Sequence, residues 1–192
     1  GVLAYASDPA APTAAYVAER LGLPTNPLAS VETLSEKHLF RGFLAQHGFP
    51  CPQVRVARAD IPAAELLAVA DALSYPLMLK PTDSSGSKGV TRVDEPDVAM
   101  FERALAHARE YSRNGTLVLE EYIRPGFPRV IGGDVFVVRG RVTFWGLMSC
   151  LRDESLGGLV PVGERYPSGL ARTQEDAVRQ QVQRLVSELG ME

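Results

Sequence analysis

Residues 75–90, YPLMLKPTDSSGSKGV, are the stretch from which the fold of this chain can be predicted. An apolar run of strand length ends at Lys80, a polar loop of small residues follows, and GVTRV (89–93) then has the composition of a second strand. Short apolar runs bounded by Gly and Pro are typical of buried strands. The segment therefore predicts two strands joined by a Gly/Ser-rich loop, with a lysine where the loop begins.

The loop of residues 82–90 is suited to holding an anion. Its small residues and its two glycines, Gly86 and Gly89, let backbone N–H groups converge, and Lys88 adds a positive charge. Neither GxxxxGK[ST] nor GxGxxG is present, so this is neither a Walker A loop nor a dinucleotide fingerprint. The composition favours a phosphate chain as ligand, and a simple mobile connection is the alternative.

Lysine is rare in this chain of 192 residues: there are three, Lys37, Lys80 and Lys88, against 17 arginines. A chain that uses arginine for its surface can keep lysine where a compact charge on a flexible stem is needed. Lys80 ends an apolar strand, where a cation needs a partner unless its stem snorkels to water. We therefore expect the three lysines to lie at the functional site.

A second strand-like segment, TLVLEEYI (116–123), ends in two adjacent carboxylates. Because side chains alternate along a strand, Glu120 and Glu121 must face opposite sides. Adjacent residues cannot flank one bond, so the pair does not fit a glycosidase. One of them could accept a hydrogen bond from an adenine amino group, and a strand end that becomes polar on leaving the core is the alternative.

Composition excludes several other classes of protein. The chain is 45% hydrophobic and 22% charged with a net charge of −3, which suits a folded domain but neither duplex nucleic acid nor an anionic membrane. Two isolated cysteines, Cys51 and Cys150, indicate a reducing compartment and hence the cytoplasm. The three histidines lack metal-ligand spacing, so no zinc site or Ser/His triad is predicted.

Around these segments the chain predicts an α/β (α+β) fold. Residues 53–122 read β-α-β-β-α-β, a module that can fold as its own layer. We expect a hairpin over 134–148 with its turn at Arg139 and Gly140, loop over 150–169, and an amphipathic helix over 173–189. GVLAYAS (1–7) reads as a strand. Thr33 and Glu36 form a capping box for the helix that carries Lys37.

The ordered set Lys37, Lys80, SSGSKGV (84–90) and LEEYI (119–123) resembles the ATP-grasp superfamily of carboxylate-amine ligases. Within that superfamily, the sequence is most similar to carbamoyl-phosphate-synthase-like and amino-acid-ligase-like members. In such proteins a helix lysine, matched by Lys37, binds the nucleotide phosphates, and a strand lysine, matched by Lys80, contacts the α- and β-phosphates. The Gly-rich loop folds over the phosphates as part of a lid, and the LEEYI strand is the adenine hinge.

The resemblance implies an ATP-binding site made of Lys37, Lys80, the loop, the hinge and an acidic residue on the next strand. The implied loop and hinge residues are Ser84, Ser85, Gly86, Ser87, Lys88, Gly89, Val90, Glu120, Glu121, Tyr122 and Ile123, and the acidic residue is Asp134. Glu120 would meet the adenine amino group. Arg124 stands where an acidic ribose contact is common.

The implied activity is an ATP-dependent ligation in which a carboxylate forms an acyl phosphate that an amine or similar nucleophile attacks. The implied cofactors are ATP and Mg²⁺, with the metal-binding Glu and Asn expected outside this chain. Small-molecule carboxylate and amine substrates are the expected partners, with no nucleic acid or membrane, and a homo-oligomer is left open.

By the same resemblance, the chain is expected to be an incomplete ATP-grasp fold. Residues 1–30 would be the remnant of a preceding α/β domain and residues 31–192 the ATP-grasp domain. The latter would comprise a lid over about 53–122 and a truncated C-terminal subdomain over 123–192. Two alternatives stay open: a non-catalytic nucleotide-binding or assembly module such as a split-gene subunit, and a scaffold that has lost ATP.

Overall fold

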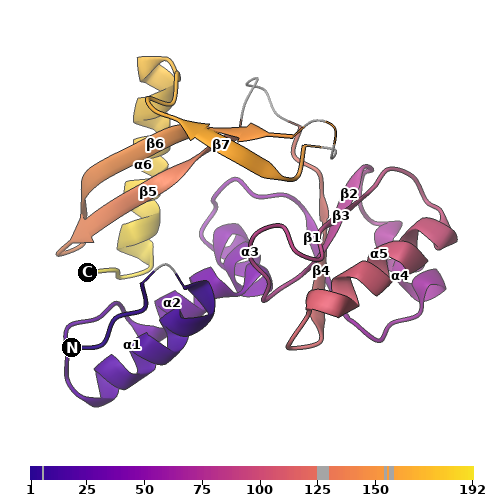
Figure 1. Cartoon of the computed structure of the whole chain (residues 1–192), viewed down its shortest axis with the longest axis horizontal. Coiled ribbons are helices and arrows are strands. Elements are labelled where there is room, and N and C mark those ends of the chain that lie inside the picture. The colour runs from indigo at the N-terminus through magenta and orange to yellow at the C-terminus, as the bar shows by residue number, and fades with distance from the viewer. Residues whose placement is uncertain (6, 125–129, 154, 156–157) are drawn as a thin grey trace. The chain divides into compact units, whose positions relative to one another are not determined.

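The computed structural model describes residues 1–5, 7–124, 130–153, 155 and 158–192. The chain forms two compact units, one of residues 1–16 and 31–123 and the other of residues 17–30 and 124–192 (Figure 1). The division falls within the helices α1 (Ala11–Arg20) and α2 (Leu28–Ser35).

The rest of the first unit contains the predicted β-α-β-β-α-β module, which the structure confirms. After α3 (Lys37–Gln46) it runs β1 (Val54–Arg58), α4 (Ala63–Ala70), β2 (Leu77–Pro81), β3 (Thr91–Val93), α5 (Val98–Tyr111) and β4 (Thr116–Glu121). All strand pairs are antiparallel in the order β1-β4-β2-β3. Figure 1 shows α4 and α5 together beside this sheet.

The core of the first unit lies between the sheet and these two helices. Leu77 and Leu79 of β2 and Leu117 and Leu119 of β4 are fully buried against residues such as Phe101 of α5. Because alternate side chains point to opposite faces, Lys80 and Glu120 lie on the other face of the sheet. The apolar alternation of two neighbouring strands thus places a lysine and a carboxylate side by side, away from the core.

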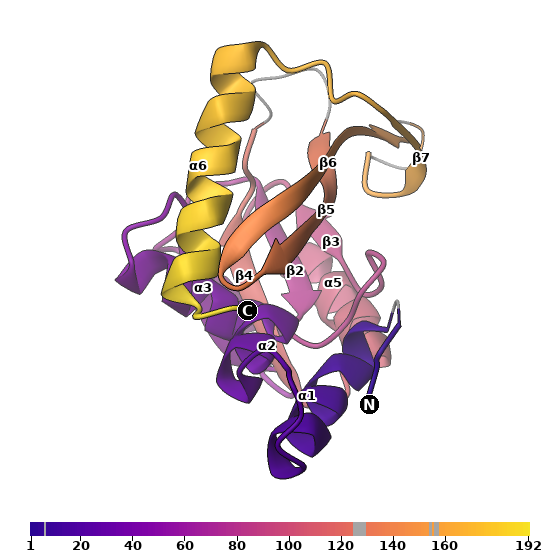
Figure 2. The ribbon, with the colours of Figure 1, turned by 90° about the vertical axis from the view of Figure 1, so that its left-hand side faces the viewer.

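The second unit is built around a three-stranded antiparallel sheet in the order β5-β6-β7. Its elements are β5 (Val130–Val138), β6 (Arg141–Arg152), β7 (Pro161–Arg165) and α6 (Arg172–Glu188). Figure 2 shows α6 running along β5 and β6. The Arg179 guanidinium of α6 lies 5.0 Å from the ring centre of Trp145 on β6. The hairpin turn predicted at Arg139 and Gly140 is confirmed, and both residues have positive φ.

Three local predictions were wrong. Residues 1–5 and 7 form no strand, because no other described strand pairs with their backbone. Thr33 is not the N-cap residue of α3, because it lies inside α2, and Glu36 takes that position. The expected loop over 150–169 contains β7, because pairing with β6 outweighs the local Gly/Pro composition.

Gly89 should tolerate alanine less well than Gly86. Both residues have positive φ, but a Cβ on Gly89 would lie 2.8 Å from Pro81 Cγ, whereas a Cβ on Gly86 meets nothing within 4 Å. We expect Gly86→Ala to cost about 1–2 kcal/mol through its backbone alone. Gly89→Ala should cost roughly 1–3 kcal/mol more through overpacking. Urea unfolding followed by circular dichroism measures both, and equal stabilities would contradict the close approach.

Candidate functional site

A buried ion cluster joins β2, β4 and α3. The Glu120 carboxylate accepts hydrogen bonds from Arg41 Nε at 2.9 Å and Nη2 at 3.4 Å, and from Lys80 Nζ. The side chains of Glu120, Lys80 and Arg41 are 7%, 14% and 18% exposed. Met78 lies directly opposite Glu120, which makes Lys80 its diagonal neighbour on the same face. Two cations therefore share one carboxylate in a largely desolvated place.

The cluster keeps Glu120 ionised. Burial by itself would raise the pKa of this carboxyl, but hydrogen bonds from Arg41 and Lys80 and the charges of both residues outweigh it, so the pKa lies below the ordinary 4.5. The neighbouring Glu121 faces the helix side of the sheet and accepts a hydrogen bond from the Ser74 N–H at 2.8 Å. The two adjacent carboxylates thus have separate roles, as strand alternation predicts.

The lowered pKa of Glu120 leads to a pH prediction. A carboxylate with a depressed folded-state pKa stabilises the fold above its unfolded pKa, and this contribution is lost as pH falls through the folded pKa. The stability difference between the unaltered chain and Glu120→Gln should therefore be constant near neutral pH and shrink below the ordinary value of 4.5. Urea midpoints of both proteins across this range test it, and a difference that does not change with pH would contradict it.

Lys37 begins α3 and reaches the Gly/Ser-rich loop. Its backbone N–H donates to Thr82 O at 3.1 Å, and its ammonium donates to Thr82 O at 3.4 Å and to Ser84 O. Burial and the nearby charge of Lys80 lower the pKa of Lys37, against the opposing charges of Asp83, Glu36 and Glu120. Lys37 and Lys80 are thus close enough to repel one another, and an anion between them would relieve that repulsion.

The loop after β2 has a left-handed backbone at three positions. Gly86, Ser87 and Gly89 all have positive φ, and Ser87 is the residue for which this conformation is strained. Ser84 Oγ donates to Lys88 O at 2.9 Å, which closes the loop on itself. Lys88 is exposed, while Gly89 is buried at the point where the chain returns to the sheet.

The beginning of this loop is fixed by residues that the sequence reasoning missed. Asp83 Oδ2 accepts hydrogen bonds from the backbone N–H of Arg113 at 3.0 Å and of Asn114 at 2.9 Å. The Asn114 side chain donates to Thr82 Oγ1 at 2.8 Å and to Glu36 Oε2 at 3.0 Å. The Asn-Gly pair at 114–115 is a turn signal that marks this connection, but it does not say which residues it holds.

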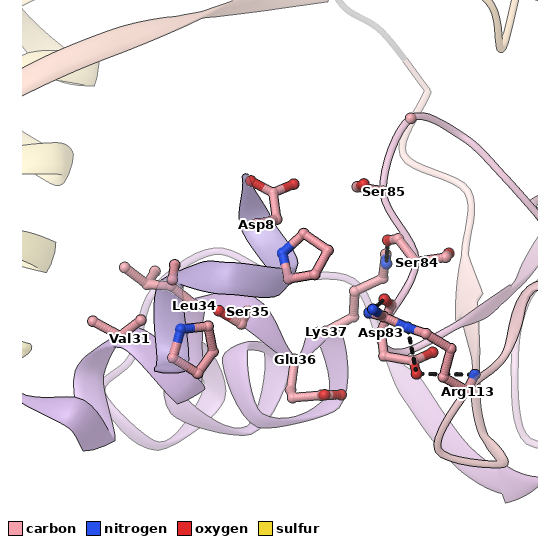
Figure 3. Close-up of a pocket in the computed structure, with 14 residues that line it drawn as sticks. Asp8, Val31, Leu34, Ser35, Glu36, Lys37, Asp83, Ser84, Ser85 and Arg113 are labelled. Carbon is pink, nitrogen blue, oxygen red and sulfur yellow. Dashed lines mark hydrogen bonds and ion pairs between the residues drawn. The ribbon is translucent and has the colours of Figure 1, made fainter. Parts of the chain in front are cut away.

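A pocket of about 610 Å³ lies within the first unit beside Lys37 and the loop. It brings together four of the predicted site residues with others that the prediction did not name. The predicted ones are Lys37, Ser84, Ser85 and Gly86, and the added polar ones include Glu36, Asp83 and Arg113. Figure 3 shows that Lys37 contacts Ser84 and that Asp83 contacts Arg113. Lys80 and Glu120 do not line this pocket and lie in the ion cluster instead.

The other predicted residues lie at the end of β4, along the loop and in the second unit. The Tyr122 N–H donates to Pro76 O at 2.9 Å, and its ring lies 4.9 Å from the Arg92 guanidinium. Ile123 is 68% exposed. Val90 is the last residue of the loop and is half-buried. Asp134 belongs to β5, where it pairs with Gly146, so its place in an ATP site stays a prediction.

Among the described residues no group of three or more His, Cys, Asp or Glu is arranged to hold a metal ion. The described helices include none with the length and apolar character needed to cross a bilayer.

The chain is similar to known proteins in sequence and in structure. No family model matches the chain. Over 109 residues, 56% of its length, it is 30% identical to the ATP-grasp enzyme fsqD of Aspergillus fumigatus, of which it covers 17%.

Two solved structures resemble nearly the whole chain. The L-amino acid ligase of Bacillus licheniformis matches 96% of it with a TM-score of 0.67 and 24% identity. The biotin carboxylase domain of a Hydrogenobacter thermophilus 2-oxoglutarate carboxylase, solved with MgADP, matches 95% with a TM-score of 0.69 and 21% identity. The chain spans 41% of each of these structures.

Proposed function

We propose that this chain, which has the ATP-grasp fold and is 30% identical over 109 residues to an ATP-grasp enzyme, is the ATP-binding part of a ligase that activates a carboxylate as an acyl phosphate. An amine or a similar nucleophile then displaces the phosphate. The fold itself is the expected ATP-grasp fold, here with antiparallel sheets and the β-α-β-β-α-β module. Since the chain spans 17% of the similar enzyme and 41% of each of the two similar structures, the activity of the whole protein is part of the proposal.

One observation carries this proposal: Lys37 at the start of α3 donates to the carbonyls of Thr82 and Ser84, which come directly after the strand that carries Lys80. The Gly/Ser-rich loop starts at the same place, and its carbonyls hold the Lys37 ammonium. Two neighbouring cations at the start of a loop of small residues favour a polyphosphate over a single carboxylate. Phosphoryl transfer needs such positioning and charge neutralisation more than it needs a protein nucleophile.

Each residue can be given a role in binding ATP. Lys37, Lys80 and the loop of residues 84–90 would hold the phosphates, and closing of the loop would exclude water. Glu120 would accept a hydrogen bond from the adenine amino group. The backbone around Tyr122 and Ile123 would contact the edge of the adenine ring, and because the Tyr122 N–H donates to Pro76 O, Ile123 would supply the N–H. Asp134 would complete the site from β5.

Magnesium belongs to the proposed chemistry, since the similar biotin carboxylase domain was solved with MgADP. In the part of the chain that the structure describes, no group of three or more His, Cys, Asp or Glu is arranged to hold a metal ion. We therefore assign no step of the reaction to a metal held by these residues. That the ligands lie outside the chain stays a prediction.

The substrates and the location follow from the same proposal. Small-molecule carboxylates and amines are the proposed substrate classes, as befits a relative of an amino acid ligase. Both cysteines, Cys51 and Cys150, are free thiols, in agreement with a reducing compartment such as the cytoplasm.

Calorimetric titration with ATP, ADP, AMP and adenosine tests the proposal. Affinity should rise with the number of phosphates, because Lys37, Lys80 and the loop contact phosphate and not the base. Equal affinity for all four ligands, or no binding, would contradict the proposed site. ADP release in a panel of carboxylates and amines then distinguishes a ligase from a non-catalytic nucleotide-binding module, which would bind ATP without turnover.

A further inference from the structure

A nucleotide bound at this place would compete for the hydrogen bonds of the buried ion cluster. Lys80 donates to Glu120 Oε1, the same oxygen that Arg41 Nη2 reaches at 3.4 Å, while Arg41 Nε holds Oε2 at 2.9 Å. In the proposed function the Lys80 ammonium turns from the carboxylate toward phosphate. Glu120 would then lose one of its two cations while remaining buried.

We propose that Arg41 is a positioning residue of the nucleotide site: it holds Glu120 ionised so that Lys80 can leave that carboxylate for the nucleotide phosphates. This inference rests on the proposed function. A carboxylate that is only 7% exposed is costly to leave without a cation and takes up a proton instead. Arg41 prevents this, because a guanidinium stays charged at every accessible pH and its fork matches the carboxylate.

The surroundings of Glu120 leave this task to Arg41. Within the described residues, the charged groups that act on Glu120 are Arg41 and Lys37 from α3 and Lys80 from β2. The neighbouring strand β1 places the apolar Val54 directly opposite Glu120. Lys37 is bonded to the carbonyls of Thr82 and Ser84, and in the proposed site it also turns to phosphate. Arg41 is therefore the cation that stays with Glu120 when both lysines bind the nucleotide.

The proposed movement of Lys80 from Glu120 to phosphate also couples phosphate binding to adenine binding. When Lys80 leaves Oε1, that oxygen regains an acceptor position, and the exocyclic N–H of adenine can occupy it. Arg41 keeps its hydrogen bond to Oε2 throughout, so the carboxylate does not rotate away. Phosphate binding by Lys80 and adenine binding by Glu120 would then support each other through one side chain that touches neither ligand.

The test compares ADP binding by the unaltered chain and by Arg41→Gln, at about pH 6 and about pH 8, in buffers of different ionisation enthalpy. Without Arg41, Glu120 must take up a proton when Lys80 leaves. Arg41→Gln should therefore bind ADP roughly tenfold more weakly at the higher pH, corresponding to about one pKa unit. The difference in ADP affinity between Arg41→Gln and the unaltered chain should narrow at the lower pH. ADP binding by Arg41→Gln should also take up more protons than ADP binding by the unaltered chain.

Three further variants separate this role from a merely structural one. Arg41→Lys keeps the charge and should restore the pH profile of the unaltered chain. The double variant Arg41→Gln, Glu120→Gln has no carboxylate to protonate and should lose the extra proton uptake. Arg55→Gln is the matched control, because Arg55 is also half-buried but donates to Val54 O at 2.9 Å and does not contact Glu120.

The outcomes distinguish this inference from the proposed function. No ADP binding by the unaltered chain would overturn both, whereas ADP binding with the same proton uptake in Arg41→Gln would overturn only this inference. Should Arg41→Gln fail to fold, Lys80→Met carries the test without any ligand. Its Glu120 carboxyl, held by Arg41 alone, should still titrate below 4.5 by NMR, and a higher midpoint would overturn the inference.

Discussion

Replacing Glu120 with alanine should lower the free energy of unfolding by about 3–5 kcal/mol, because it leaves two buried cations without their shared carboxylate. Lys80 and Arg41 are 14% and 18% exposed, so water can replace Glu120 only in part. Urea unfolding followed by circular dichroism measures the loss.

The neighbouring Glu121→Ala is the matched control for this change. It lies on the same strand but faces the other side, where it accepts one hydrogen bond from the Ser74 N–H. We expect it to cost about 1 kcal/mol, as for one ordinary hydrogen bond. Equal losses in the two variants would mean that the cluster is not the stabilising feature of this face.

Replacing Lys80 with methionine should weaken ATP binding by roughly 10- to 150-fold, the equivalent of about 1.5–3 kcal/mol for hydrogen bonds between charged groups. The fold should survive, because Glu120 keeps its hydrogen bonds from Arg41. Calorimetry with ATP gives the affinity, and thermal melting shows that the fold is intact.

An exposed cation serves as the control for Lys80. Arg103→Met removes a positive charge from α5, on the helix side of the sheet, and should leave ATP affinity unchanged. If both variants bind ATP as tightly as the unaltered chain, Lys80 has no place in the nucleotide site.

Part of the site could be predicted from the sequence because each feature has a local signature. Lys80 ends an apolar strand, and the small residues after it indicate a loop that can hold an anion. Strand alternation predicts that Glu120 and Glu121 face opposite sides, and the structure confirms this. The module over 53–122 could be predicted from hydrophobic periodicity and turn residues, since Gly, Pro or Asn residues occur in the connections between its strands and helices.

The remaining features depend on contacts between distant segments. Arg41 is one of 17 arginines, and only the packing of α3 against β4 brings it to Glu120. Asp83 and Asn114 are 31 positions apart, and their hydrogen bond requires the register between β2 and β4. β7 has little strand signal of its own and forms because β6 offers it a partner. No window of sequence contains this information.

In the proposed function the three lysines of this chain surround one nucleotide. Because lysine is rare in this chain, the response of each lysine side chain can be measured directly. With lysine as the single labelled residue type, a carbon-detected NMR spectrum contains side-chain signals from Lys37, Lys80 and Lys88 alone, and single substitutions assign them. Titration with ADP should shift all three signals along one saturation curve, while adenosine should leave Lys37 and Lys88 unchanged. Lysine signals that stay in place while ADP is added to excess would contradict the account.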